Sequence, residues 1–318
     1  MADSEVFAIY CLSVYRNDNS KISKLTSNKQ VQSRSGVAER RRRSVISDDK
    51  IGKYQLKKTL RSSTDRSVFL AYDPFLDRQV AIKVIQLCSQ DDVSASPALD
   101  QFFFEARSIA RLQHPNIVSI YDADIGDFEG YLVMEYIAGE SLQSQLAKQD
   151  YLPTQQIEQI FSSLTYALAY AHRKGVVHRD IKPSNIMIES DGRTKLLDFG
   201  IADRICVGDE QEKPLAGSPS YMAPELFDAA SPSSQSDIFA LGVVLYQCLC
   251  GQLPFVAEQA HSVLYKILNE SPIPAHEVNA KLVPSVSAVI DRALDKDPSQ
   301  RYADAEQLFA DLSVAFES

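Results

Sequence analysis

The stretch Val177–Gly200 constrains the fold of this chain more than any other part of the sequence. It contains two apolar runs, Ile186–Ile188 and Lys195–Leu197, with Asp191-Gly192 between them. Asp-Gly between apolar runs is the strongest short-range signal for a β-hairpin, because a two-residue turn of this type needs left-handed backbone at both positions. The sequence therefore predicts a hairpin with these two residues as its loop.

The predicted loop also sets the register of the two strands. Ile186 is expected to face Leu197, and Asn185 is expected to face Asp198 at the open end of the hairpin. Directly opposed residues of an antiparallel pair have Cβ atoms roughly 4.5–5.5 Å apart. An amide oxygen and a carboxylate would then meet, and oxygen ligands of this kind suit a hard cation such as Mg²⁺ that is held partly by substrate phosphates.

Two motifs in this stretch point to a known family. The segment HRDIKPSN, from His178 to Asn185, and the later Asp198-Phe-Gly resemble the catalytic and metal-binding segments of eukaryotic-type protein kinases. The Lys182-Pro-Ser-Asn form resembles the serine/threonine class. The segments His114-Pro-Asn-Ile-Val and Tyr221-Met-Ala-Pro-Glu are similar to those of bacterial relatives. An ordinary surface hairpin with scattered charges is the alternative, but it does not explain two long motifs in this order and spacing.

The resemblance covers roughly residues 54–316 and implies an α+β fold with two lobes. A small β-rich N-lobe with one helix is expected over about residues 54–136, and a larger α-helical C-lobe over about residues 140–316. Residues 1–50 are expected to form a disordered basic tail, since they hold ten Lys and Arg against six Asp and Glu. The run Arg40–Arg43 in this tail is interpreted as a solvated arm, with a docking or phosphorylation site at Ser44 as the alternative.

Composition excludes several other classes of protein. The net charge of −9 argues against a general nucleic-acid binder. No apolar stretch reaches the ~18–20 residues that a membrane-spanning helix needs. The five cysteines show neither the spacing of metal ligands nor a disulfide framework, so we expect a cytoplasmic protein in a reducing compartment.

The loop expected to cover the ATP phosphates departs most from the family. The pattern G-x-G-x-x-G-x-V aligns its valine with Val68 and places Arg61, Ser63 and Arg66 at the three glycine positions. Glycine there lets backbone N–H groups approach phosphate closely, although Arg and Ser side chains can still donate hydrogen bonds to it. Two hypotheses therefore stay open: an active serine/threonine kinase that uses MgATP, and a pseudokinase that keeps the fold as an interaction module.

A lysine and a glutamate in the expected N-lobe suggest a pair. Lys83 lies in an apolar strand, Val-Ala-Ile-Lys, where an unpaired charge is costly to bury. The segment Leu99–Gln113 has helical periodicity, and Glu105 borders its apolar face. The resemblance implies that these two side chains pair and hold the α- and β-phosphates of ATP, whereas a solvated helix edge is the alternative for the glutamate.

The resemblance also assigns roles at the expected active site. Asp180 would accept or orient the proton of the substrate hydroxyl, Lys182 would lie near the transferred phosphoryl group, and Asn185 and Asp198 would hold Mg²⁺. Met134 would be the gatekeeper, and backbone groups of the hinge residues Glu135 and Ile137 would meet adenine. The residues expected to contact ATP are Leu60, Arg61, Ser63, Val68, Ala81, Lys83, Glu105, Met134, Glu135, Ile137 and Met187.

The segment after the second motif, Ile201–Glu225, resembles an activation loop and has no Ser, Thr or Tyr before Gly217. Our hypothesis is that one of its acids (Asp209, Glu210 or Glu212) supplies the negative charge that Arg179 would meet in relatives through a phosphorylated residue. Arg301 is expected to pair with Glu225 as a structural bridge. The resemblance further implies protein substrates and a homodimer formed through the N-lobe.

Overall fold

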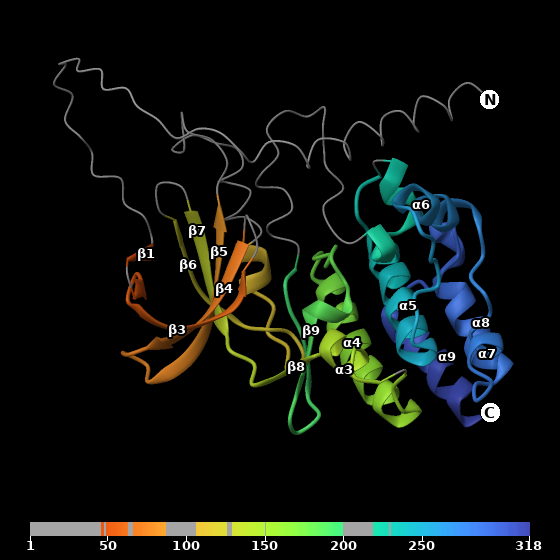
Figure 1. Cartoon of the computed structure of the whole chain (residues 1–318), viewed down its shortest axis with the longest axis horizontal. Coiled ribbons are helices and arrows are strands. Elements are labelled where there is room, and N and C mark those ends of the chain that lie inside the picture. The colour runs from red at the N-terminus through yellow and green to blue at the C-terminus, as the bar shows by residue number, and fades with distance from the viewer. Residues whose placement is uncertain are drawn as a thin grey trace, which may run out of the picture.

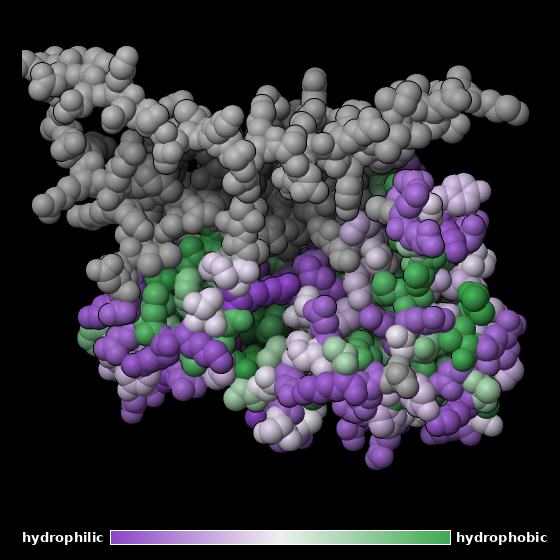
Figure 2. All heavy atoms as spheres, in the orientation of Figure 1, coloured by the Kyte–Doolittle hydropathy of each residue, from purple (hydrophilic) through white to green (hydrophobic). Residues whose placement is uncertain are grey.

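The computed structural model of the chain describes residues 46–47, 49–62, 66–86, 106–125, 129–149, 151–199, 219–228 and 230–318. A β-sheet lobe and a helical lobe lie side by side (Figure 1). This is the two-lobed α+β arrangement that the sequence predicts. Hydrophilic residues predominate along the outer edge of both lobes on the face drawn in Figure 2. No helix among the described residues is long and apolar enough to cross a membrane.

The N-lobe is built on a seven-stranded antiparallel sheet with the strand order β1-β2-β3-β4-β5-β7-β6. Its strands are β1 (Ile46–Ser47), β2 (Lys50–Ile51), β3 (Tyr54–Ser62), β4 (Arg66–Asp73), β5 (Arg78–Gln86), β6 (Ile120–Ile125) and β7 (Glu129–Glu135). The first two strands fall at or before residue 51, so the sheet begins within the segment that the sequence assigns to a tail. Ile51 explains this, because it pairs with Ile46 and is fully buried.

One face of this sheet carries residues that the sequence predicts to meet ATP. The register pairs Val68 with Lys83 and Ala81 with Met134. Side chains that are directly opposite each other, or two residues apart on one strand, point to the same face of a sheet. This face joins the main hydrophobic core, and the opposite face buries a separate apolar cluster around Ile82.

The C-lobe is organised around helix α5, whose side chains are buried along almost its whole length. Ser233 caps its N-terminus in a capping box, and Gly251 ends it with a left-handed φ of 72°. The elements of this lobe are β8 (Gly139–Ser141), α3 (Leu142–Leu146), α4 (Thr154–Arg173), η2 (Pro183–Asn185), β9 (Ile186–Glu189), β10 (Thr194–Leu196), η3 (Pro219–Tyr221), η4 (Pro224–Asp228), α5 (Ser234–Cys250), α6 (Ala260–Asn269), α7 (Ala275–Val278), α8 (Pro284–Ala293), η5 (Pro298–Gln300) and α9 (Ala305–Glu317).

Strands β9 and β10 form the hairpin that the sequence predicts, but the predicted register is wrong by one residue. Ile186 pairs with Leu196 instead of Leu197. The loop has three residues, 190–192: the N–H of Gly192 donates to the carbonyl of Glu189 at 3.0 Å, and the N–H of Glu189 donates to the carbonyl of Arg193 at 2.9 Å. Of the three loop residues, only the glycine has a left-handed φ, at 87°. A type I turn followed by a left-handed glycine is the usual geometry of such a loop.

The hairpin is completed by β8, which pairs with β9. A Cβ atom on Gly139 would lie 2.2 Å from the carbonyl oxygen of Ile188, so only glycine allows the two strands to come this close. The hairpin is thereby packed against the chain segment that leaves the N-lobe.

A largely buried ion pair links the segment after the expected activation loop to the end of the C-lobe. As predicted, Arg301 pairs with Glu225, with N···O distances of 2.8 and 2.7 Å. The guanidinium also donates to the carbonyl of Asp295 at 2.8 Å, so its hydrogen-bonding capacity is well used. When two charged groups are removed from water in this way, the loss of one leaves the other as an uncompensated buried charge.

A buried amine lies beside this pair. Among the residues that the structure describes, the Nζ atom of Lys296 has no hydrogen-bond partner, and it lies 4.0 Å from the ring centre of Phe255 and 5.9 Å from that of Phe239. Burial lowers the pKa of Lys296 to about 8, and the charge of Arg301 contributes in the same direction. The two aromatic rings offset only part of the cost of burying this charge.

Replacing Arg301 with methionine should leave the Glu225 carboxylate buried without its partner. We expect the free energy of unfolding to fall by about 3–5 kcal/mol in urea denaturation at pH 7. The control is Arg193→Met, which removes the ion pairs of an exposed guanidinium with Asp191 and Glu189 and should lower the free energy of unfolding much less, because solvent screens exposed charges. Equal losses in the two variants would contradict this account.

Replacing Lys296 with methionine should stabilise the protein at pH 7 by about 1 kcal/mol, because a buried charge is removed. The pKa of this lysine is lower in the folded state (about 8) than its ordinary value of 10.5, so the unfolded state binds more protons between these pH values. The stability of the wild type therefore rises with pH across this window, and the advantage of the variant should shrink. Urea denaturation at pH 7, 8.5 and 10 measures it, and a constant difference would count against the assignment.

Candidate active site

One carboxylate of helix α5 holds the loop that carries Asp180. Asp237 is almost fully buried and accepts the backbone N–H groups of His178 at 2.8 Å and Arg179 at 2.9 Å. Its Oδ2 atom also lies 2.8 Å from Nε2 of His172. Arg179 has a φ of 73°, and a left-handed conformation costs a non-glycine residue roughly 1–2 kcal/mol. The two backbone hydrogen bonds stabilise this turn and so fix the direction of the next residue.

His178 connects the same loop to the second motif. Its buried ring accepts the N–H of Asp180 at Nδ1 (3.2 Å) and contacts the carbonyl of Leu197 through Nε2 (2.8 Å). The ring also packs on Phe199, with ring centres 4.5 Å apart. Burial lowers the pKa of His178, and the neutral ring can accept at one nitrogen and donate at the other. The two motifs are thus joined through one side chain.

Three of the predicted catalytic and metal-binding residues meet within one loop. The Nζ atom of Lys182 lies 2.8 and 2.6 Å from the two carboxylate oxygens of Asp180. Asn185 is 2% exposed, and its Nδ2 atom donates to the backbone carbonyl of Asp180 at 2.8 Å and to Oδ2 at 2.9 Å. The single turn η2 brings these side chains together. Because the N–H₂ group of the amide faces the aspartate, the Oδ1 atom is the one turned toward other partners.

Lys83 reaches across from the N-lobe sheet to the second motif. Its Nζ atom is 2.8 Å from Oδ1 of Asp198, and the lysine is 6% exposed. Burial raises the pKa of this carboxyl, but the charge and hydrogen bond of Lys83, with the charge of Lys182, outweigh it and hold the pKa below its ordinary value. The carboxylate is therefore ionised at neutral pH and can accept a cation.

The predicted direct opposition of Asn185 and Asp198 is wrong, because of the slipped register. The N–H of Leu197 donates to the carbonyl of Asn185 at 2.8 Å, so Leu197 is the residue opposite the amide. Asp198 then takes a left-handed φ of 55°, outside strand geometry. A non-glycine residue held in this conformation is a form of strain that clusters at functional sites.

The predicted nucleotide-contacting residues divide into described and undescribed ones. Ala81, Met134 and Ile137 are buried, and Val68 and Met187 are half-buried. Leu60 and Arg61 are exposed near the end of β3. Ser63 and Glu105 lie outside the described residues, as does the segment 201–218 with its three acids, so the predicted Lys83–Glu105 pair and the substitute-charge hypothesis stay predictions.

The expected Mg²⁺ site differs in kind from a metal centre made only of protein side chains. Within the part of the chain that the structure describes, no three His, Cys, Asp or Glu side chains gather as metal ligands. Mg²⁺ commonly takes one or two carboxylates and fills its remaining positions with water and substrate phosphates. Asn185, with its Oδ1 turned away from Asp180, and the ionised Asp198 fit that pattern.

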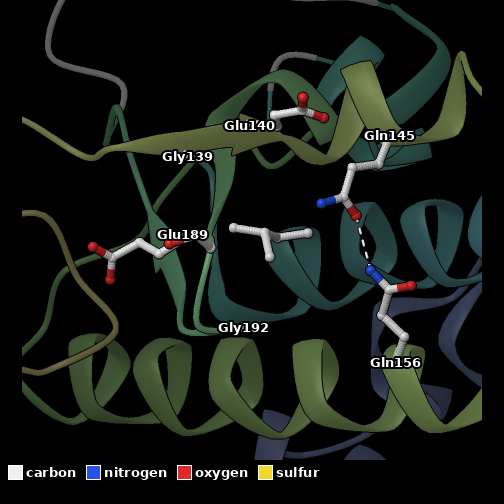
Figure 3. A pocket seen from close by; sticks show the side chains of 8 residues that line it. Gly139, Glu140, Gln145, Gln156, Glu189 and Gly192 are labelled. Atoms are coloured by element: carbon white, nitrogen blue, oxygen red, sulfur yellow. Dashed lines mark hydrogen bonds between the residues drawn. The ribbon is translucent and has the colours of Figure 1, made fainter.

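Two hollows lie near these motifs. A small cavity of about 20 Å³ is lined by Asp180, Tyr221 and Met222, among other residues. A larger pocket of about 430 Å³ lies between the hairpin and helices α3 and α4 and contains none of the predicted site residues. Figure 3 shows Gln156 donating to Gln145 at one side of this pocket, with the carboxylate of Glu189 directed away from that pair.

The sequence did not identify two residues that organise the site. Asp237 starts the apolar run Ile238–Leu249 and matches the aspartate of the family pattern D-x-W-x-x-G, but neither feature predicts its bonds to the loop that carries Asp180. Lys195 lies in an apolar strand as Lys83 does, so the same cost of burial should have predicted a partner for it. The structure supplies that partner in Glu135, at 2.8 Å.

Comparisons with known proteins agree with this geometry. Residues 54–312 match the model of the protein kinase domain family. The chain therefore belongs to the protein kinase family, and the fold is the bilobal protein-kinase fold.

Relatives are found among bacterial kinases. The chain is 37% identical over 268 residues to the serine/threonine-protein kinase PrkC of Bacillus subtilis. The aligned region covers 84% of this chain and 41% of the relative. It is 37% identical over 269 residues to PksC of Streptomyces coelicolor (81% and 48%), and 35% identical over 267 residues to PknB of Mycobacterium leprae (82% and 42%). The chain spans less than half the length of these relatives.

Replacing Asp237 with alanine should free the two backbone N–H groups that it accepts. Each unsatisfied buried donor costs about 1–3 kcal/mol, and misplacement of a catalytic group by about 1 Å can lower a rate roughly 10²-fold. We expect a large fall in kcat, and a smaller fall for Asp237→Asn, which keeps one acceptor oxygen. Steady-state kinetics with parallel thermal melts test this, and an alanine variant with wild-type kcat would refute it.

Proposed function

We propose that this chain is a serine/threonine protein kinase that transfers the γ-phosphoryl group of ATP to hydroxyl groups of proteins, itself included, with Mg²⁺ as cofactor. One observation carries the proposal: Asp180, Lys182 and Asn185 are joined by hydrogen bonds beside the Lys83–Asp198 pair that bridges the lobes. Phosphoryl transfer needs mainly positioning and charge stabilisation, and this arrangement offers both.

Each residue then has a role that its contacts support. The Asp180 carboxylate accepts or orients the proton of the substrate hydroxyl, and its orientation is fixed because Asn185 and Lys182 both donate to its Oδ2 atom. The ammonium group of Lys182 lies where it can balance charge on the transferred phosphoryl group. Lys83, which pairs with the Asp198 carboxylate in this structure, would hold the phosphates.

The metal ligands on this chain are proposed to be Asn185 and Asp198. When bound, Mg²⁺ supplies charge neutralisation for the phosphates. The strained φ of Asp198 and its ion pair with Lys83 keep that carboxylate at the junction of the two lobes.

The adenine ring is proposed to bind between apolar side chains of the two lobes. Val68 and Ala81 share one face of the N-lobe sheet, and Met187 lies in the C-lobe hairpin. Backbone groups of Glu135 and Ile137, which follow the gatekeeper Met134, would meet the edge of the ring. Leu60, Arg61 and Ser63 would cover the phosphates, and Glu105 would pair with Lys83.

The pseudokinase hypothesis is less favoured. The lid lacks glycine, which argues for weaker phosphate contacts, but the residues proposed to carry transfer are present, and the contacts of Asp180 with Lys182 and Asn185 support this role. Relatives named as serine/threonine-protein kinases support the enzyme. A homodimer through the N-lobe and a cytoplasmic location stay predictions.

Replacing Asp180 with asparagine should lower phosphotransfer at least about 10²-fold, because proton transfer by a positioned carboxylate contributes 10²–10⁴-fold. Binding of MgATP, measured by calorimetry, should stay near the wild-type value. Autophosphorylation and transfer to a general protein substrate with labelled ATP and Mg²⁺ provide the readout, and Lys148→Met is a matched surface control. A wild type that binds MgATP but transfers no more phosphate than Asp180→Asn would favour the pseudokinase.

A further inference from the structure

Strand β3, which leads into the loop expected over the phosphates, carries an extra residue close to its end. Thr59 pairs with Phe69 of β4. Two residues later, Arg61 pairs with Val68, which is only one residue away from Phe69 on the partner strand. Leu60 is therefore the extra residue of a β-bulge. Bulges of this kind are common next to active sites, where they re-aim a side chain.

The bulge turns Arg61 to the other face of the sheet. Side chains alternate between the two faces of a strand, so in a regular strand Thr59 and Arg61 would share a face. Their observed partners lie on opposite faces, because Phe69 packs on the apolar cluster around Ile82 and Val68 packs on the main core. Directly opposed residues share a face, so Arg61 points to the face of Val68.

On this face Arg61 stands in one row with Lys83. Val68 pairs with Arg61 on one side and with Lys83 on the other, across the neighbouring strands β3, β4 and β5 (Figure 1). Adjacent strands lie about 4.8 Å apart, so the Cα atoms of the two cationic residues are separated by about 10 Å. The Nζ atom of Lys83 lies 2.8 Å from Oδ1 of Asp198, at the proposed phosphate end of the site.

The Arg61 side chain is exposed, and no carboxylate among the residues that the structure describes pairs with it. We propose that Arg61 binds the α- and β-phosphates of the nucleotide from the β3 side, opposite Lys83, in place of the backbone N–H groups that a glycine loop offers. A guanidinium presents a planar fork of charged donors that suits phosphate. This inference rests on the proposed function and deepens it, because it gives the glycine-free loop its own way of holding phosphate.

The proposal and a simple loss of glycine predict opposite effects of one substitution. If Arg61 only prevents the close approach that glycine allows, Arg61→Gly should tighten nucleotide binding. If the guanidinium binds the phosphates, the same change should weaken the binding of ADP and leave that of adenosine unchanged. The contact is between exposed charges, so its contribution should also fall as salt shortens the screening length.

The test is the affinity of Arg61→Gly for ADP with Mg²⁺, measured by calorimetry at low salt. We expect Kd to rise by about five- to twentyfold, because charge-assisted hydrogen bonds are lost. The Kd of adenosine, measured by competition with ADP, should change less than about twofold, since adenosine has no phosphate for the guanidinium to bind. At about 0.5 M KCl the difference in ADP affinity between wild type and variant should shrink to about two- to threefold.

Two further variants at Arg61 separate its charge from its shape. Arg61→Lys keeps the charge but loses the fork, so its Kd for ADP should rise by no more than about threefold. Arg61→Gln keeps a long polar side chain without the charge and should lose as much ADP affinity as Arg61→Gly. The glutamine variant decides the inference if the glycine variant does not fold, and thermal melts check the folding of each.

Lys57→Met is the matched control on the same strand. Its amine lies 5.7 Å from the ring centre of Tyr72, which is four residues from Val68 along β4. The variant therefore removes a cation from β3 without touching the row that contains Lys83, and its ADP affinity should stay within about twofold of the wild type.

Three results would overturn the inference. The first is an ADP affinity of Arg61→Gly that equals or exceeds that of the wild type. The second is an equal loss of adenosine affinity, and the third is a loss of ADP affinity that high salt leaves unchanged. Either of the last two would show an altered shape of the loop instead of a lost contact with phosphate.

The inference and the proposed function can fail separately. If the wild type binds ADP but transfers no phosphate, the proposed function fails, and the ADP affinity of Arg61→Gly still decides the role of the guanidinium. If the wild type transfers phosphate and the ADP affinity of Arg61→Gly is unchanged, the role of Arg61 alone fails. A wild type that binds no nucleotide would overturn both.

Discussion

The buried carboxylate of Asp237 is the contact on which the catalytic loop depends. It lies in the first turn of α5, where the helix dipole stabilises negative charge, and it accepts two consecutive backbone N–H groups. An ionised group this deeply buried is costly unless its hydrogen-bonding capacity is used. Here that capacity holds Arg179 in a left-handed conformation, and the direction of Asp180 follows from it.

Two ion pairs then join the lobes, and their surroundings give them different properties. Lys83–Asp198 lies where phosphates and a metal are expected, so it is suited to exchange partners during a reaction cycle. Lys195–Glu135 lies behind the hinge and is surrounded by backbone hydrogen bonds between β10 and the segment 116–119. One link lies where a ligand is proposed to bind, and the other is part of the framework that aligns the lobes.

Sequence reasoning predicted the architecture well and the fine geometry less well. The two lobes and the apolar strand that carries Lys83 were predicted, and the two motifs identify the family. The hairpin register was missed because Asp191-Gly192 suits both a two-residue loop and the last two positions of a three-residue loop, and local sequence does not separate them. The partner of Lys195 could not be predicted either, since it lies 60 residues away and depends on how the lobes meet.

The bonds between β10 and the segment 116–118 have a consequence for biosynthesis. Asn116 contributes its side-chain amide to Thr194, which is 78 residues later in the chain. At translation rates of 5–20 residues per second, that partner emerges roughly 4–16 s afterwards. During this interval the polar groups of segment 116–118 that bond to β10 in the folded protein can bond to water instead. The hydrogen bonds at the back of the N-lobe are therefore completed only when a short strand from the other half of the protein has been made.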